Sequence, residues 1–90
     1  MKKIVITVVG KDQVGIIGKV CTFLADRSIN ILDITQTIVA GYFNMMMIVE
    51  AEQTGDEFIK MVDDLKALGE TIGVVIQAQN EDIFNMMHRI

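Results

Sequence analysis

The amino-acid sequence predicts an α+β fold: a ferredoxin-like βαββαβ sandwich in which two helices cover one face of a four-stranded antiparallel sheet, followed by a short C-terminal helix. Two observations predict this fold. Segments with the two-residue apolar period of strands alternate with segments of helical period, in the order strand, helix, strand, strand, helix, strand. The two strand–helix–strand halves are alike, and 90 residues suffice for one domain but not for two, so we expect a single domain over 1–90.

The first half opens with β-branched residues at 4–9, a composition typical of a central strand covered on both faces. We expect Gly10 to end this strand and Asp12 to cap the next helix, because an aspartate accepts hydrogen bonds from first-turn N–H groups. Apolar residues then recur at i, i+3, i+4 and i+7, which predicts a helix with one buried stripe. The stripe consists of Ile17, Val20, Cys21 and Leu24.

A second strand is expected at about 29–38. Its side chains should alternate between the two faces of the sheet, as in any regular strand. Alternation directs Ile31 and Asp33 to one face, and Leu32 and Ile34 to the other.

The third strand is expected at 42–52, after a tight turn at Ala40 and Gly41. Alternation again divides its side chains between two faces. One face carries Phe43, Met45, Met47 and Val49, and the other carries Tyr42, Asn44, Met46, Ile48 and Glu50.

The second helix is expected to begin at a capping-box pattern, in which Thr54 is followed three residues later by Glu57. It should run to about Leu68, with Gly69 as its C-terminal stop. Its apolar stripe repeats the spacing of the first helix and consists of Phe58, Met61, Val62 and Leu65.

A fourth strand is centred on 74–76, and Asn80 then caps a short last helix whose apolar side contains Ile83, Met86 or Met87, and Ile90. Because both longer helices cover one face of the sheet, the other face lacks a cover made by them. We expect either the terminal helix or a second subunit to shield it.

Composition excludes several classes of function. The chain is 51% hydrophobic, which is rich for a monomer of this size and favours a homodimer. Its net charge of −4 argues against binding along the phosphates of a nucleic acid, which requires a basic surface. The first strand also has no aromatic side chain on which an RNA base could stack. No stretch approaches the ~20 apolar residues of a membrane span. One cysteine cannot form an intrachain disulfide, which fits the reducing cytoplasm.

Catalytic chemistry is not indicated. The one histidine, His88, lies on a polar stretch near the C-terminus, and Cys21 lies on a buried stripe, where it acts as a small core hydrophobe. Adjacent carboxylates such as Asp63 and Asp64 do not face one another across a cleft. We therefore expect no enzyme activity, no metal and no cofactor.

The first loop, 10–18, carries the remaining chemistry. Gly15 opens a helix, so first-turn N–H groups point outward at the positive end of the helix dipole. Either a tight turn with close packing or a pocket for a carboxylate fits this pattern. Asn30 begins the second strand, where we expect it to lie close to the first loop. Its amide either completes a turn or grips the ammonium or carboxylate of an amino acid.

The order strand, Gly10-x-Asp12-x-x-Gly15, helix, then Asn30-Ile31-x-Asp33-Ile34 resembles the ACT domain family over essentially the whole chain. The chain is most similar to small stand-alone ACT-domain proteins. It also resembles the ACT modules of the glycine cleavage system transcriptional repressor and of formyltetrahydrofolate deformylase.

The resemblance implies a regulatory domain that binds a small ligand, typically an amino acid, at a subunit interface. Carried over by position, the polar loop contact falls on Asp12, the close-approach glycine on Gly15, and the strand amide on Asn30. The other residues implied to line the site are Gln13, Val14, Ile16, Ile31 and Asp33.

Two departures from the family pattern bear on the ligand. Val14 stands where many ACT domains have proline, so the loop is less rigid. Asp12 stands where several members have an amide, which favours a ligand ammonium over a carboxylate.

We therefore expect a homodimeric regulatory module that binds an amino acid or a related metabolite between 12–16 of one chain and 30–33 of its neighbour. The alternative is a ligand-free interaction module that docks on a metabolic enzyme or regulator.

Overall fold

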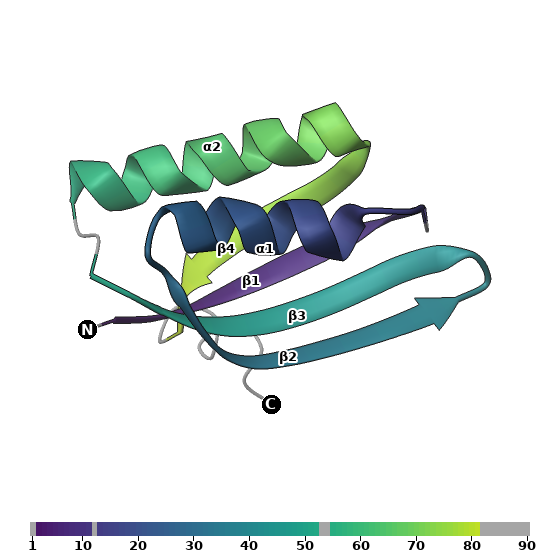
Figure 1. Cartoon of the computed structure of the whole chain (residues 1–90), viewed down its shortest axis with the longest axis horizontal. Helices are drawn as coiled ribbons and strands as arrows, with labels where there is room; N and C mark the ends of the chain where they lie inside the picture. The colour runs from purple at the N-terminus through teal and green to yellow at the C-terminus, as the bar shows by residue number, and fades with distance from the viewer. Residues whose placement is uncertain (1, 12, 53–54, 82–90) are drawn as a thin grey trace.

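The computed structural model of the chain describes residues 2–11, 13–52 and 55–81 and contains a four-stranded sheet in the order β2-β3-β1-β4, antiparallel throughout. Both helices lie on one side of this sheet (Figure 1). The predicted ferredoxin-like fold is confirmed. In chain order its elements are β1 (Lys2–Lys11), α1 (Ile16–Asp26), β2 (Asn30–Val39), β3 (Tyr42–Ala51), α2 (Asp56–Ile72) and β4 (Val74–Asn80).

The two middle strands form the base of the core. β1 pairs with β3 on one side and β4 on the other, as its β-branched composition predicts for a central strand. The predicted division of β3 into two faces is also confirmed, since burial alternates along it. The helix-facing side chains of these two strands that are buried are Ile4, Ile6, Val8, Phe43, Met45, Met47, Val49 and Ala51.

Gly10 does not end the first strand, contrary to our prediction, because β1 continues to Lys11. Gly10 lies opposite Val74 of β4, and a Cβ added to Gly10 would come within 2.7 Å of Val74 Cγ1. The glycine therefore permits close approach of β4 to β1.

A β-bulge changes the faces of β2 from those predicted. The register shifts between Ile31 and Asp33, so that Ile31 pairs with Val49 but Ile34 pairs with Met47. Ile31 and Ile34 consequently share the helix-covered face, while Asp33 points to the opposite face. The Ile34 N–H donates to Asp33 Oδ1 at 2.8 Å and stabilises the bulge.

The two helices cover the sheet with the predicted apolar stripes. In α1, Val20 and Leu24 are buried with Ile16, while Ile17 and Cys21 are half-buried against the same core. The expected core role of Cys21 is confirmed. In α2 the buried residues are Met61, Leu65, Gly69 and Ile72.

Gly69 does not stop the second helix, contrary to our prediction. α2 continues to Ile72, and Gly73 ends it in the left-handed conformation with φ 91°, donating its N–H to Gly69 O at 2.8 Å. Gly69 is buried instead. It lies so close to β4 that a Cβ added there would come within 2.7 Å of Val74 O. The predicted Thr54 capping box and the terminal helix with His88 lie outside the described residues.

An ion cluster on the outer surface ties the helices together. Asp64 of α2 accepts from Lys60 Nζ at 3.1 Å and from Arg27 Nη2 at 3.3 Å. The Arg27 guanidinium also stacks 3.6 Å from the ring centre of Phe23. The hydrogen bond from Lys60, reinforced by Arg27 and opposed by desolvation, lowers the pKa of Asp64 below its usual 3.8.

The second sheet face, which we call the open face, is not covered by α1 or α2 (Figure 1). Exposed apolar side chains on this face are Val9, Val39, Tyr42, Met46 and Val75. In the described part of the chain, no helix is long and apolar enough to span a membrane.

Candidate functional site

The first loop joins β1 to α1 and projects from one end of the molecule. Gly15, the residue before α1, adopts φ 92°, a left-handed conformation that favours glycine. Val14 is 99% exposed beside it. Gly15 offers no capping side chain, so its conformation leaves first-turn N–H groups available to an anion. Asp12, the polar loop residue expected to contact the ligand, lies outside the described residues.

Ile16 and Gln13 offer fewer free groups to a ligand than the sequence suggests. The Ile16 side chain is buried in the core, so only its backbone can line a site. Gln13 Nε2 donates to the Ile72 carbonyl at 2.6 Å and thereby caps the end of α2. This bond spans 59 positions of the chain, a separation at which local sequence patterns give no signal.

The second group of predicted site residues lies at the start of β2. Asn30 pairs with Glu50 and is exposed, with its side chain on the open face. Asp33, beyond the bulge, is exposed on the same face. Ile31 is half-buried on the helix-covered face, where it packs against the core.

The structure does not bring the two groups together within one chain, so the expected closeness of Asn30 to the first loop was wrong. Asn30 is level with Glu50 and Lys3, whereas β1 reaches the first loop beyond Lys11. Eight residues of strand separate Lys3 from Lys11, which corresponds to ~26 Å. The first loop and the start of β2 lie at opposite ends of the sheet (Figure 1). The physical reason is that α1 runs antiparallel to β1 and returns the chain to the end where β1 began.

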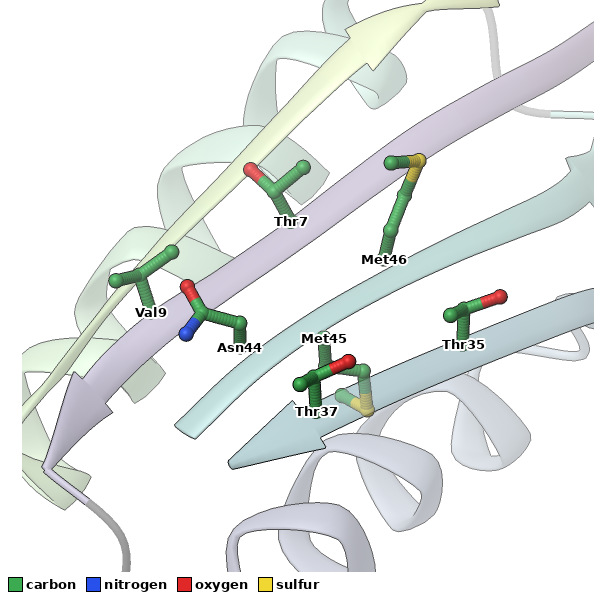
Figure 2. Close-up of a pocket in the computed structure, with 7 residues that line it drawn as sticks. All are labelled: Thr7, Val9, Thr35, Thr37, Asn44, Met45 and Met46. Carbon is green, nitrogen blue, oxygen red and sulfur yellow. The ribbon is translucent and has the colours of Figure 1, made fainter. Parts of the chain in front are cut away.

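Sequence reasoning missed a shallow hollow of about 260 Å³ on the open face. Figure 2 shows its residues on three neighbouring strands, with the helices behind the sheet. The alternation of β3, which places Asn44 and Met46 on one face, is the signal that could have found it. The residues that line it are Thr7, Val9, Thr35, Thr37, Asn44, Met45 and Met46.

Neither region has the groups expected of a metal centre. Within 2–11, 13–52 and 55–81, no three His, Cys, Asp or Glu side chains are placed to hold an ion. The charged cluster around Asp64 links two helices, and each of its acid–base pairs lies on the surface. The geometry offers hydrogen-bonding groups and surfaces for association.

These features define a small βαββαβ module with an exposed glycine loop and a second sheet face that neither α1 nor α2 covers (Figure 1). The chain belongs to the ACT domain family, whose sequence model matches residues 2–79. Membership of this family indicates a small-molecule-binding regulatory module.

Known proteins of similar sequence and structure agree with this membership. A UPF0237 protein of Bifidobacterium longum is 56% identical over 90 residues, which is the full length of both chains. The structure of an ACT domain protein from Streptococcus pneumoniae superposes with a TM-score of 0.82 at 40% identity, covering 92% of this chain and 93% of that one.

A more distant likeness concerns the fold alone. A formyltetrahydrofolate deformylase from Pseudomonas syringae pv. tomato has a TM-score of 0.78 at 20% identity, covering 89% of this chain and 28% of that one. The same fold therefore also occurs as one part of a longer protein.

Proposed function

We propose that the chain is a non-catalytic regulatory module of the cytoplasm that binds an amino acid or a related small metabolite as a homodimer. The observation that carries this proposal is the exposed first loop, in which left-handed Gly15 opens α1. The positive end of a helix favours a carboxylate. Membership of the ACT domain family supports a small ligand.

The proposed site is shared between two chains. The first loop and the start of β2 are ~26 Å apart within one chain, a distance that one amino acid cannot span. A neighbour must therefore supply the second half of the site. The site residues on this proposal are Asp12, Gln13, Val14, Gly15 and Ile16 of one chain, and Asn30, Ile31 and Asp33 of the neighbour.

The described residues of the two halves suit the two ends of a zwitterion. The N-terminus of α1 takes the carboxylate, since backbone N–H groups at that end have no partner within the helix. The acid Asp12, which disfavours a ligand carboxylate, is expected to accept from the ligand ammonium instead. The amide of Asn30 and the exposed carboxylate of Asp33 take the ammonium. Asp33 Oδ1 accepts the Ile34 N–H, so Oδ2 is the oxygen expected to face the ligand.

A thermal-shift screen of the full chain against the amino acids and related metabolites tests this proposal. A ligand at ~100 times its Kd adds about 2.7 kcal/mol. Each kcal/mol moves the Tm of a domain this small by about 4–8 °C, so a selective ligand should raise it by ~10 °C or more. A flat panel would contradict the proposal.

Two variants with matched controls then test the site. Asn30→Ala should raise the Kd about tenfold, the effect of ~1.4 kcal/mol of lost hydrogen bonding, while Gln77→Ala, at an exposed position of β4, should not. Gly15→Ala should weaken binding, whereas Gly41→Ala, which strains a left-handed turn with φ 81°, should lower stability without changing the Kd. Equal Kd values in all four variants would remove the site assignment.

A second candidate function is a ligand-free interaction module that docks on a metabolic enzyme or regulator. The exposed apolar side chains of the open face favour it, because methionine adapts to irregular partner surfaces. A stoichiometric complex with one such protein, together with a flat metabolite panel, would support this function over the first.

A further inference from the structure

We propose that residues 82–90 of the chain lie across the open face at the end of the sheet where β1 begins, with Val5 at the centre of the contact. This inference goes beyond the proposed function, because it assigns a role to a segment that the proposed ligand site does not use. Its consequence is that only the other end of the open face is free to meet a partner.

The burial of Val5 indicates that part of the open face is covered. Its side chain points to this face, because the neighbouring Ile4 and Ile6 belong to the core on the helix-covered face. Val5 is nevertheless only 4% exposed, although neither α1 nor α2 covers the open face (Figure 1). A second copy is not the cause, because this exposure is that of one chain alone.

Val9 provides a comparison within the same strand. Both valines lie on the open face of β1, and each pairs with a residue of β3 on one side and a residue of β4 on the other. Val9 is 47% exposed. Flanking strands alone therefore do not bury a valine on this face, and Val5 requires a cover that Val9 lacks.

Exposure across the sheet outlines the covered area. At the level of Val5, the open face carries Gln79 of β4, Ile48 of β3 and Asp33 of β2. Gln79 and Ile48 are half-buried, whereas Asp33 is exposed. Two residues before Ile48 in β3, Met46 is 43% exposed. The cover therefore lies over β4, β1 and β3 near Val5, and it leaves β2 free.

Residues 82–90 follow the described chain at a point beside this area. β4 ends at Asn80, which pairs with Ile4, the residue before Val5. Adjacent strands are ~4.8 Å apart, so a segment that leaves β4 at this point reaches Val5 within a few residues.

The other residues outside the described ranges are poorly placed to cover Val5. Residue 12 follows Lys11 at the opposite end of β1. Residues 53–54 lead from β3 to α2, which lies on the other side of the sheet (Figure 1). Met1 precedes Val5 by four positions, which corresponds to ~13 Å of strand.

The length and composition of residues 82–90 suit the covered area. Nine residues in the helix predicted there would be ~14 Å long. Three adjacent strands are also ~14 Å wide. The helical period places Ile83, Met86 or Met87, and Ile90 on one side. Contact of this side with Val5 and Ile48 removes apolar surface of both from water, which stabilises the contact.

The cover divides the open face into two parts. Asn30 and Asp33 stay exposed on β2, so the second half of the proposed ligand site remains accessible. Val9 and Met46, which line the hollow, also stay exposed at the other end of the face. A protein that docks on the open face therefore meets only the end with the hollow.

Thiol labelling of the full chain tests the cover. Cys21→Ala removes the one native thiol, and Val5→Cys or its matched control Val9→Cys then introduces a single new one. An aromatic disulfide reagent measures the reaction rate. A covered thiol reacts only when its cover opens, so Val5→Cys should react about tenfold or more slowly than Val9→Cys.

Substitutions in 82–90 then identify the cover. Ile83→Asp, and independently Ile90→Asp, place a charge on the apolar side and should raise the rate of Val5→Cys by about the same factor. Asn85→Asp introduces the same charge away from that side, and Val5→Cys should stay protected. The rate of Val9→Cys should be similar in all these variants, which shows that the sheet remains folded.

Three results would overturn the inference. Equal rates for Val5→Cys and Val9→Cys would show that both ends of the face are open. Protection of Val5→Cys that persists in both Ile83→Asp and Ile90→Asp would assign its burial to side chains of the sheet. Protection that disappears on dilution would assign it to a second copy. None of these rates depends on a ligand, so this inference and the proposed function can fail separately.

Discussion

Two glycines in the helices differ in how crowded their surroundings are. Gly69 of α2 lies against β4, where an added Cβ would meet the Val74 carbonyl oxygen at 2.7 Å and Ile76 Cγ1 at 3.0 Å. Gly18 of α1 has open space around the same position. The first glycine sets the distance between helix and sheet, and the second does not.

Alanine at these two positions should therefore have opposite effects on stability. We expect Gly69→Ala to lower the free energy of unfolding by about 1–3 kcal/mol, as overpacking does. Gly18→Ala, its matched control, should raise it by about 0.5–1 kcal/mol, because alanine loses less conformational entropy in a helix. Urea unfolding measures both. A loss of stability in Gly18→Ala, or none in Gly69→Ala, would contradict this account of the packing.

At the scale of elements, the pairing of α1 with α2 depends on pH through Asp64. Its pKa in the folded chain lies below its usual 3.8, chiefly because Lys60 hydrogen-bonds to the carboxylate. Below about pH 4 the unfolded chain therefore binds more protons than the folded one at this group. The contribution is fully present above that pH and is lost as the pH falls through the folded pKa.

Asp64→Asn tests this dependence. The variant should lose a small amount of stability near pH 7, as expected of a surface ion cluster. Its unfolding free energy should also fall less steeply with pH between 4 and 2 than that of the wild type. Asp63→Asn changes the neighbouring exposed carboxylate, which forms no ion pair among the described residues, and should follow the wild type. If the unfolding free energies of the wild type and of Asp64→Asn fall equally steeply between pH 4 and 2, the predicted pH dependence through Asp64 is excluded.

For the whole molecule, the strand order predicts a gradient of local stability. β1 and β3 are paired on both sides, whereas β2 is an edge strand exposed along most of its length. Free energies of local opening range from near zero at such edges to the global value in central strands. The middle of the sheet should therefore be the last part to open.

Amide hydrogen exchange measures this gradient. The slowest amides of β1 and β3 should exchange on the order of a hundredfold or more slowly than the unpaired amides of β2. Equal protection of β2 and β1 would indicate edge pairing between chains.

Local patterns in the sequence predicted most of the fold. Burial alternates along β3 as its side chains do, and the stripes around Val20 and Leu65 lie in the core, because residues at these spacings share a face in any strand or helix. The turn at Ala40 and Gly41 is also confirmed, with φ of 53° and 81°.

Contacts between elements explain what the patterns missed. Gly10 and Gly69 resembled ends of elements, yet both make room for Val74 of β4, which follows Gly10 by 64 positions and Gly69 by five and belongs to a different element from each. The bulge after Ile31 follows from pairing with β3, and a one-residue shift reverses every later side chain. No local period contains this information.

The sequence by itself determined the element order, the apolar faces of β3 and of the two helices, and the resemblance to the ACT domain, because each depends on residues within a few positions of one another. Only the tertiary structure decided that the first loop and Asn30 lie at opposite ends of the sheet, that Gln13 caps α2, and that Met46 lies beside a hollow. These facts depend on how separate segments pair in space. A helix that runs antiparallel to β1 returns the chain to the far end of the sheet, and this geometry makes a second chain necessary for the proposed site.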